Sequence, residues 1–256
     1  MQYAVVTSKD NIAGMNIVSF LEGNLPKNVS LHFLEGHICF LDKANEINAD
    51  VIIFASTHKS SMEKPALTTH CIGNWGKAEL GGRERTLVPT NSFLLKNYLK
   101  ALQNQKEKLA LAYEVCAEVT HHGPFLEKPA VFIELGSSEK QWRDKKAAEA
   151  VANAILESTS TEGSYRSAIA IGGGHYCPEF TKLVLRTDWA LGHICPEYAL
   201  QHFDGEMLQK AIGSTFPRPE AIIIDWKGLK GEKQRIRQLL ENQGLPVFRV
   251  RSLLSR

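Results

Sequence analysis

Short, nearly continuous apolar stretches rich in β-branched residues recur along the chain. Strands that are covered on both faces of a sheet have this composition, whereas strands with one wet face alternate apolar and polar residues. The predicted strands are Tyr3–Thr7, Val51–Ser56, Ala130–Leu135, Ser167–Ile171 and Ala221–Asp225.

Apolar residues at helical spacing mark three segments between these strands: 93–118, 139–157 and 230–243. Gly244 and Pro246 close the last helix before a final predicted strand, Val247–Val250. Strands that alternate with helices predict an α/β fold, with a mixed, largely parallel sheet and helices on both faces. We expect residues 1–256 to form a single α/β domain or two closely packed lobes.

The segment Ser56–Leu87 has a different composition. It is rich in Ser, Thr, Gly, His and Lys and has few periodic apolar residues. A long loop-rich stretch inside a compact domain is usually functional or a small insert. We therefore expect residues 56–90 to form a smaller, loop-rich insert.

Charge is unevenly distributed, although the net charge is only +2. The segment Lys227–Arg256 holds eight basic and two acidic residues, about +6, which leaves about −4 on the preceding part. A basic segment on a slightly acidic body suits a polyanionic partner. A solvated amphipathic helix explains the same charges, and charge alone does not separate the two interpretations.

The chain has neither a secretory signal pattern nor an apolar run near the ~18 residues that span a bilayer. Its five cysteines are an odd number, which favours reduced thiols over a disulfide framework. We expect a cytoplasmic protein with no membrane partner.

Five of the nine histidines lie at or just beyond the ends of predicted strands or helices, where open α/β sheets bind ligands. Histidine is suited both to binding zinc and to moving a proton near neutral pH. These five are His58, His70, His121, His122 and His175.

His121 and His122 precede Gly123-Pro124, a tight loop that can turn both imidazoles to the same side. Glu134 follows at the end of an apolar strand, where a buried carboxylate is costly unless it is paired or bound to a metal. Two histidines and a glutamate with one open position fit a catalytic zinc site. The alternative is that His122 caps a helix and Glu134 pairs with a lysine.

The strand Ile169–Ile171 leads into Gly172-Gly173-Gly174 and His175. Glycines allow positive φ angles and a close approach to a ligand. Because the phosphate-loop pattern GxxxxGK[ST] is absent, we interpret this turn as one that presents His175 to a substrate.

Other chemistries are less well supported. A structural zinc set of His175, Cys177, His193 and Cys195 has suitable ligand types, but its spacing fits no standard finger. Neither a GxSxG elbow nor an HExxH motif occurs, which disfavours a serine hydrolase and a zincin.

Several linked segments together resemble the archaeal and plant type of D-aminoacyl-tRNA deacylase. They are AVVTSKDNIAGMNI at the start, His58–Ser61 leading to Leu67–His70 and Gly73-Asn74, His121–Pro124, Phe132–Gly136, Gly173–Tyr176 and Gly192-His193. Their order and spacing cover nearly the whole chain, which is more specific than any single motif.

The resemblance implies a monomeric, zinc-dependent α/β enzyme, similar in architecture to peptidyl-tRNA hydrolases and phosphorylases. It implies hydrolysis of the ester of D-aminoacyl-tRNA, with broad tolerance of the amino acid and no DNA partner. On this interpretation a water held by a metal or a histidine attacks the carbonyl, and up to two zinc ions are expected.

Candidate roles follow for individual residues. The metal ligands are expected among His121, His122, Glu134 and His175, and the catalytic groups among His175, His122 and Glu134. Amides of Gly173 and Gly174 are candidates to steady the oxyanion. The residues placed near the tRNA are His58, Lys59, His70, Gly173, Gly174, Lys230, Lys233, Arg235 and Arg237.

Two alternatives stay open. A zinc peptidase or amidase acting on small peptides could use the same histidines and glutamate, without need of the basic C-terminal segment. A non-catalytic RNA-binding protein would have structural histidines, but only 8% of the residues are aromatic and no RNA-binding signature occurs.

Overall fold

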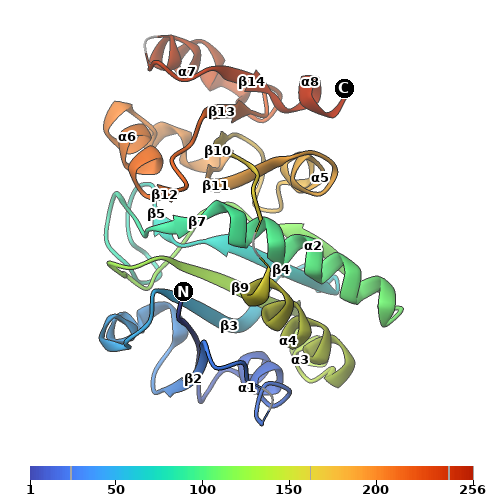
Figure 1. The fold of residues 1–256 in the computed structure, drawn as a ribbon. Helices are drawn as coiled ribbons and strands as arrows, with labels where there is room; N and C mark the ends of the chain where they lie inside the picture. Colours follow the sequence, from blue (N-terminus) through green and yellow to red (C-terminus); the bar gives the residue numbers. More distant parts are fainter. Residues whose placement is uncertain (24, 162, 242, 256) are drawn as a thin grey trace.

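The computed structural model describes residues 1–23, 25–161, 163–241 and 243–255. It contains a six-stranded sheet and a four-stranded sheet, stacked one above the other in Figure 1. The six-stranded sheet has the order β2-β1-β3-β9-β4-β8. Its strands are β1 (Tyr3–Ser8), β2 (Val29–Leu34), β3 (Val51–Lys59), β4 (Ala66–Cys71), β8 (Glu114–Ala117) and β9 (Ala130–Ser137).

The four-stranded sheet is entirely parallel and has the order β11-β10-β13-β14. Its strands are β10 (Arg166–Ile171), β11 (Trp189–Cys195), β13 (Ala221–Ile224) and β14 (Val247–Arg249). In the six-stranded sheet, β4 runs antiparallel to β9 and the other pairs are parallel. The predicted α/β fold with a mixed, largely parallel sheet is confirmed, and all six predicted strands are present.

The longest helix of the described residues, α2 (Ser92–Lys108), lies between the two sheets (Figure 1). It begins at Asn91, whose side chain accepts hydrogen bonds from the amides of Phe93 and Leu94. The ammonium group of Lys96 is buried and donates to the carbonyl oxygens of Val184, Thr187 and Trp189 at 2.5–3.0 Å. These bonds tie α2 to the second sheet, while its apolar face packs on the first.

The remaining helices cover the faces of the sheets. Helices α1 (Ile12–Val18), α3 (Glu139–Trp142) and α4 (Lys145–Ser160) lie on the α2 side of the six-stranded sheet. Its other face packs against the short helices η1 (Ile38–Phe40) and η2 (Asp42–Glu46). The four-stranded sheet has helices on both faces: α5 (Pro178–Arg186) and α8 (Val250–Leu254) on one, and η3 (Glu197–His202), α6 (Gly205–Gly213), η4 (Lys230–Glu232) and α7 (Lys233–Leu240) on the other.

The predicted helix over 93–118 was wrong beyond residue 108. The helix ends at Leu109, Ala110 has a φ of +46°, and the chain then forms β8. The predicted helix over 139–157 is two helices, because the Asp144 side chain accepts from the amides of residues 146 and 147 and starts a new one. In the predicted segment 230–243, residues 230–232 form a 3-10 turn and Asn242 lies outside the described residues. The final strand is shorter than predicted, because Val250 begins α8.

The segment 56–90 was predicted to be loop-rich, but it contains β4, which is buried throughout and lies between β9 and β8. Short strands β5 (Gly73–Asn74), β6 (Thr86–Leu87) and β7 (Thr90–Asn91) follow, and β7 pairs with β12 (Thr215–Phe216). Strand β4 was not recognised in the sequence because it contains polar Thr and His residues. In the structure these side chains face a buried polar cluster. The organisation of 1–256 as one domain or two lobes stays a prediction. None of the described helices is long and apolar enough to cross a membrane.

Candidate metal and proton-transfer site

The segment that follows β8 connects the two sheets. The amide of Glu118 donates to the carbonyl of Thr69 in β4, while those of Val119 and Thr120 donate to the carbonyls of His175 and Ile194. Residues 118–122 therefore lie where the sheets meet. Five histidines and two glutamates gather at this junction: His58, His70, His121, His122, His175, Glu118 and Glu134.

Glu118 lies at the centre of this cluster and is only 2% exposed. One carboxylate oxygen, Oε1, lies 3.1 Å from His58 Nδ1. The other, Oε2, lies 2.7 Å from His175 Nε2 and 3.7 Å from His121 Nε2. One buried carboxylate therefore contacts three imidazoles that come from three different parts of the chain.

The carboxylate of Glu134 is also buried, and it contacts the same imidazole nitrogen as that of Glu118, His58 Nδ1. Its oxygens lie 3.5 Å from His58 Nδ1 and 3.9 Å from His70 Nε2, and the Thr68 hydroxyl donates to Oε2 at 3.5 Å. The buried Glu134 carboxylate thus has imidazole and hydroxyl neighbours, which offset the cost of its burial.

The imidazole of His58 lies between both carboxylates and the hydroxyl of Tyr176, which is 2.6 Å from Nε2. Burial alone would lower the pKa of His58, but hydrogen bonds and charge attraction from Glu118 and Glu134 raise it to about 11. Burial opposes ionisation of both carboxylates in the same way. Even so, the neighbouring histidines hold the pKa of Glu134 at about 2 and that of Glu118 well below its usual range.

Three imidazoles on the other side of Glu118 share one orientation. The Nδ1 atoms of His70, His121 and His122 lie 2.9, 2.8 and 2.6 Å from the carbonyl oxygens of Cys71, Val119 and Gly123. Since a carbonyl only accepts, each Nδ1 carries a proton, and the neutral form of each ring has its lone pair on Nε2. Ligand atoms of these three residues lie within 4.8 Å of one another.

The tight loop predicted after the two adjacent histidines is present. His122 has a φ of +40°, in the left-handed region, and both imidazoles contact that of His70, with ring centroids 4.1 and 4.9 Å away. Burial, together with the charge of His70, lowers the pKa of His122 to about 4 and that of His121 well below its usual range. These two histidines are therefore neutral near pH 7, which is the form that binds a metal.

The residues fit a zinc ion. Carbonyl-anchored Nδ1 atoms are the usual second contacts of zinc-binding histidines. His70 Nε2 and both oxygens of Glu118 are buried and have no hydrogen bond of good geometry among the described residues. Buried polar atoms without hydrogen bonds are unusual, and a bound metal ion is one arrangement that would satisfy them.

The structure regroups the metal ligands predicted from the sequence. His121, His122 and His175 lie in the cluster, but three-residue groups place His121 either with His70 and His122 or with Glu118 and His175. Glu134 groups instead with His58 and Glu118. His58 and His70 were expected near the tRNA; they are 3% and 1% exposed and belong to the cluster itself. Lys59, in contrast, is exposed.

Sequence reasoning missed Glu118, because residues 114–118 were assigned to the end of a helix. Its signal was a carboxylate inside the apolar run Val115–Val119, directly before Thr120 and the two histidines. Tyr176 was missed as well. The alternative zinc set is not supported: among the described residues no candidate metal group includes Cys177, His193 or Cys195. His193 contacts the Thr120 hydroxyl and the Val88 carbonyl instead.

The glycine turn after β10 brings His175 to the junction. Gly172 and Gly173 have φ angles of +100° and +85°, which favour glycine. Gly173 packs closely on Gly228, whereas Gly174 is exposed. The His175 imidazole, 38% exposed, is thereby more open to solvent than those of His58, His70 and His121.

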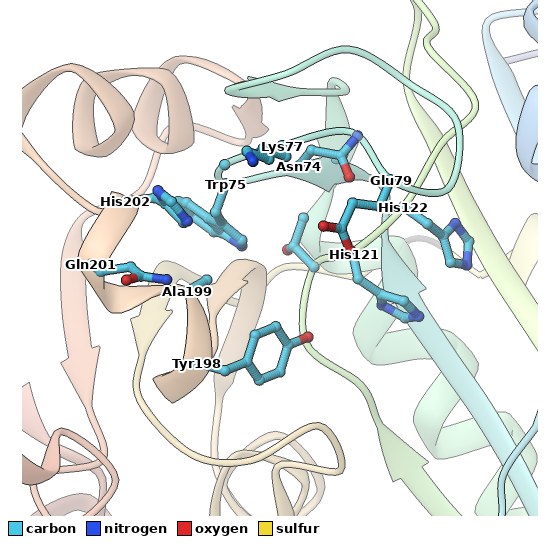
Figure 2. A pocket seen from close by; sticks show the side chains of 13 residues that line it. Asn74, Trp75, Lys77, Glu79, His121, His122, Tyr198, Ala199, Gln201 and His202 are labelled. Carbon is cyan, nitrogen blue, oxygen red and sulfur yellow. The ribbon is translucent and has the colours of Figure 1, made fainter.

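A cavity of about 430 Å³ opens beside the cluster, and His121 and His122 line it. In Figure 2, Trp75 and His202 form one wall, His121 and His122 lie on the opposite side, and the Tyr198 ring lies between them. This size is within the range of about 300–1,000 Å³ in which proteins bind small molecules.

The basic C-terminal segment is only partly available to a polyanion. Lys230 pairs with Glu197 at 2.5 Å and Arg237 with Glu241 at 3.2 Å. Arg235 donates to the carbonyls of Leu200 and Phe203, which ties α7 to η3. Lys233 is half-buried, and Arg256 lies outside the described residues.

A second cavity, of about 520 Å³, lies at the carboxyl ends of β13 and β14. Lys227, Arg249 and Arg251 line it, and the Arg249 guanidinium stacks 4.6 Å from the ring centroid of Trp226.

Comparison with known proteins finds relatives that match this chain over most of its length. A curated D-aminoacyl-tRNA deacylase from Thermococcus kodakarensis is 38% identical, over 96% of this chain and 98% of that protein. One from Pyrococcus abyssi is 41% identical, over 82% of this chain and 77% of that protein. A crystal structure described as a conserved protein of unknown function is 30% identical and has a TM-score of 0.92, over 99% of this chain and 97% of that one. The D-aminoacyl-tRNA deacylase family model matches residues 45–248. The chain therefore belongs to the D-aminoacyl-tRNA deacylase family.

Proposed function

We propose that this protein hydrolyses the ester bond of D-aminoacyl-tRNA, releasing the free D-amino acid and the tRNA. The observation that carries this function is the buried Glu118 carboxylate. It lies between His175, the candidate proton-transfer group, and His121, a candidate metal ligand. An aminoacyl ester is already activated, so it needs a positioned water and a proton acceptor. Family membership favours this substrate over small peptides or a purely RNA-binding role.

The proton is moved by His175. Glu118 Oε2 lies 2.7 Å from His175 Nε2, so the carboxylate favours a proton on that nitrogen and leaves the Nδ1 lone pair to take a proton from water. That water attacks the ester carbonyl carbon, and the resulting tetrahedral intermediate expels the ribose oxygen. His175 then returns the proton to the leaving oxygen. Glu118 orients the imidazole and stabilises its charged form.

We assign a zinc ion to the Nε2 atoms of His70, His121 and His122. Three protein ligands with a further position open is the pattern of catalytic zinc sites. When bound there, zinc supplies Lewis-acid polarisation of the water and of the ester carbonyl. His58, Glu118 and Glu134 form a separate group of candidate ligands, where a second ion would bind.

The amides of Gly173 and Gly174 were expected to steady the oxyanion. Since Gly173 packs on Gly228 while Gly174 is exposed, we keep this role for Gly174.

Phosphates of the tRNA are assigned to the basic rim of the second cavity. Lys227, Arg249 and Arg251 lie at the same carboxyl edge of the sheet as the turn that carries His175. Lys59 and Lys233 are further candidates. Lys230, Arg235 and Arg237 already have close acidic or carbonyl partners, whereas the ion pair of Arg251 with Glu179 is longer, at 3.9 Å. A monomeric state and a cytoplasmic location stay predictions.

The experiment that tests this function is hydrolysis of D-tyrosyl-tRNA, L-tyrosyl-tRNA and a small peptide by the protein as purified, after chelation and after zinc is restored. We expect loss of the D ester alone, abolished by chelation and restored by zinc. His122→Ala should lower the rate about 10²–10⁴-fold, and His32→Ala, outside the cluster, should not. Cleavage of the peptide but not of the ester would show a peptidase.

A further inference from the structure

The cavity beside His121 and His122 has walls that suit a flat, polar ligand. Aromatic and imidazole side chains come from Trp75, Tyr198 and His202, and amides from Asn74 and Gln201. Tyr198 is 57% exposed, so the face of its ring is open to a ligand in the cavity. The indole N–H of Trp75 is buried and has no hydrogen-bond partner among the described residues.

The walls of this cavity are held in place without a ligand. The guanidinium of Arg85 donates to the His202 carbonyl at 3.1 Å and pairs with Asp204 at 2.8 Å. Gly76 packs so closely on the His202 ring that a Cβ there would lie 2.5 Å from it. The loop after β5 and the helix η3 are thus joined into one preformed pocket.

We infer that this cavity binds the 3′-terminal adenosine of the tRNA. The inference rests on the proposed function, because the ester joins the amino acid to the ribose of that nucleoside. A base in the cavity places its ribose beside His121, where the cavity meets the cluster. Unstacked bases are recognised by stacking on aromatic rings and by hydrogen bonds to their edges, and the cavity offers both.

The amino-acid side chain is the competing occupant. A pocket with several fixed polar groups would discriminate strongly between side chains, because each unmatched polar group is left unpaired. The terminal nucleoside, in contrast, is the same in every tRNA. The preformed walls, which combine aromatic rings with a few fixed polar groups, therefore fit the constant part of the substrate.

Binding of uncharged tRNA tests the inference without requiring hydrolysis. We compare Kd for tRNA with its terminal adenosine and for the same tRNA shortened by that nucleotide. The wild-type protein should bind the complete tRNA about tenfold more tightly. Tyr198→Ala and Gln201→Ala should bring the ratio close to one, whereas Tyr198→Phe, which keeps the ring, and Phe216→Ala, an exposed aromatic elsewhere, should retain it.

The outcomes separate the two proposals. A ratio near one in the wild-type protein, or a ratio that Tyr198→Ala and Gln201→Ala leave unchanged, would overturn the adenosine site. If these variants instead alter the preference between D-tyrosyl and D-alanyl esters while the ratio stays near tenfold, the cavity holds the side chain. Preferential binding of the complete tRNA by a protein that cleaves no ester would support the cavity and refute the hydrolytic function.

Discussion

Replacing Glu118 by glutamine tests the arrangement on which the site depends. Glutamine has nearly the same shape as glutamate, so packing at the buried position is kept while the negative charge is lost. Glu114→Gln is the matched control, because it makes the same change four residues earlier in the same segment, where the side chain is exposed. Any difference between the two variants therefore reports the contacts of the buried carboxylate.

The contacts of Glu118 determine the size of the effect. Its oxygens lie 2.7 Å from His175 Nε2 and 3.1 Å from His58 Nδ1, which are ion-pair distances inside a buried, water-poor cluster. In catalytic triads, removing the carboxylate that orients a histidine lowers kcat about 10⁴-fold. Since His175 can still reach solvent, we expect a loss of about 10³-fold, or roughly 4 kcal/mol of transition-state stabilisation.

The assay is single-turnover hydrolysis of D-tyrosyl-tRNA at saturating enzyme, which separates the chemical step from binding. Zinc content and the affinity for uncharged tRNA are measured on the same preparations. We expect the rate to fall with tRNA affinity unchanged, and zinc affinity to fall about 10–100-fold, as for a group that contacts a ligand histidine.

A Glu118→Gln rate within about threefold of the wild-type rate would refute the reasoning, because neither the orientation of His175 nor its charge would then matter. Equal losses in Glu114→Gln and Glu118→Gln would also refute it. The effect would then come from charge anywhere in the segment.

Three further predictions follow from other parts of the structure. Burial lowers the pKa of His193 to about 4, so its stabilising contribution is complete above pH 6.5 and is lost as pH falls towards 4. Urea unfolding should therefore show about 2 kcal/mol less stability at pH 4.5 than at pH 7, and His193→Gln should remove this part of the pH dependence. Gly228→Ala should lower stability by about 1–3 kcal/mol and impair hydrolysis, because its Cβ would lie 2.2 Å from Gly173 N, while Gly231→Ala, with open space, should change neither; thermal melts and rates check this. Neutralising Lys227, Arg249 and Arg251 together should make the slope of log affinity for tRNA against log salt concentration shallower by about 2. An unchanged slope would exclude these residues as phosphate contacts.

The parts of the fold that could be predicted from the sequence are those whose pattern reflects burial alone. Continuous apolar runs such as those of β3 and β9 are buried on both faces and were recognised for that reason. Strand β4 could not be recognised in this way, because its buried Thr68 and His70 are polar residues that contact the Glu134 carboxylate. Local polarity indicated a loop, while tertiary contacts formed a strand.

The same distinction applies to the site. His121, His122 and His175 were found because adjacent histidines and a glycine turn are visible in the sequence. Glu118 was not, because its role depends on β8 lying next to β4, and this pairing joins segments that are far apart in the chain. The cavity was missed for a similar reason, since its walls come from the loop after β5 and from η3.

Residues 118–122 bond to both sheets, and this has a consequence for how the protein loses activity under stress. A protein whose C-terminal sheet has come loose would keep His58, His70 and both carboxylates in the first sheet, yet it would lack His175 and the Tyr198 wall of the cavity. Such a partly unfolded form would keep much of its secondary structure while being inactive. Loss of activity in mild denaturant should therefore precede the loss of circular dichroism signal, which makes hydrolysis a sensitive reporter of how the two sheets dock.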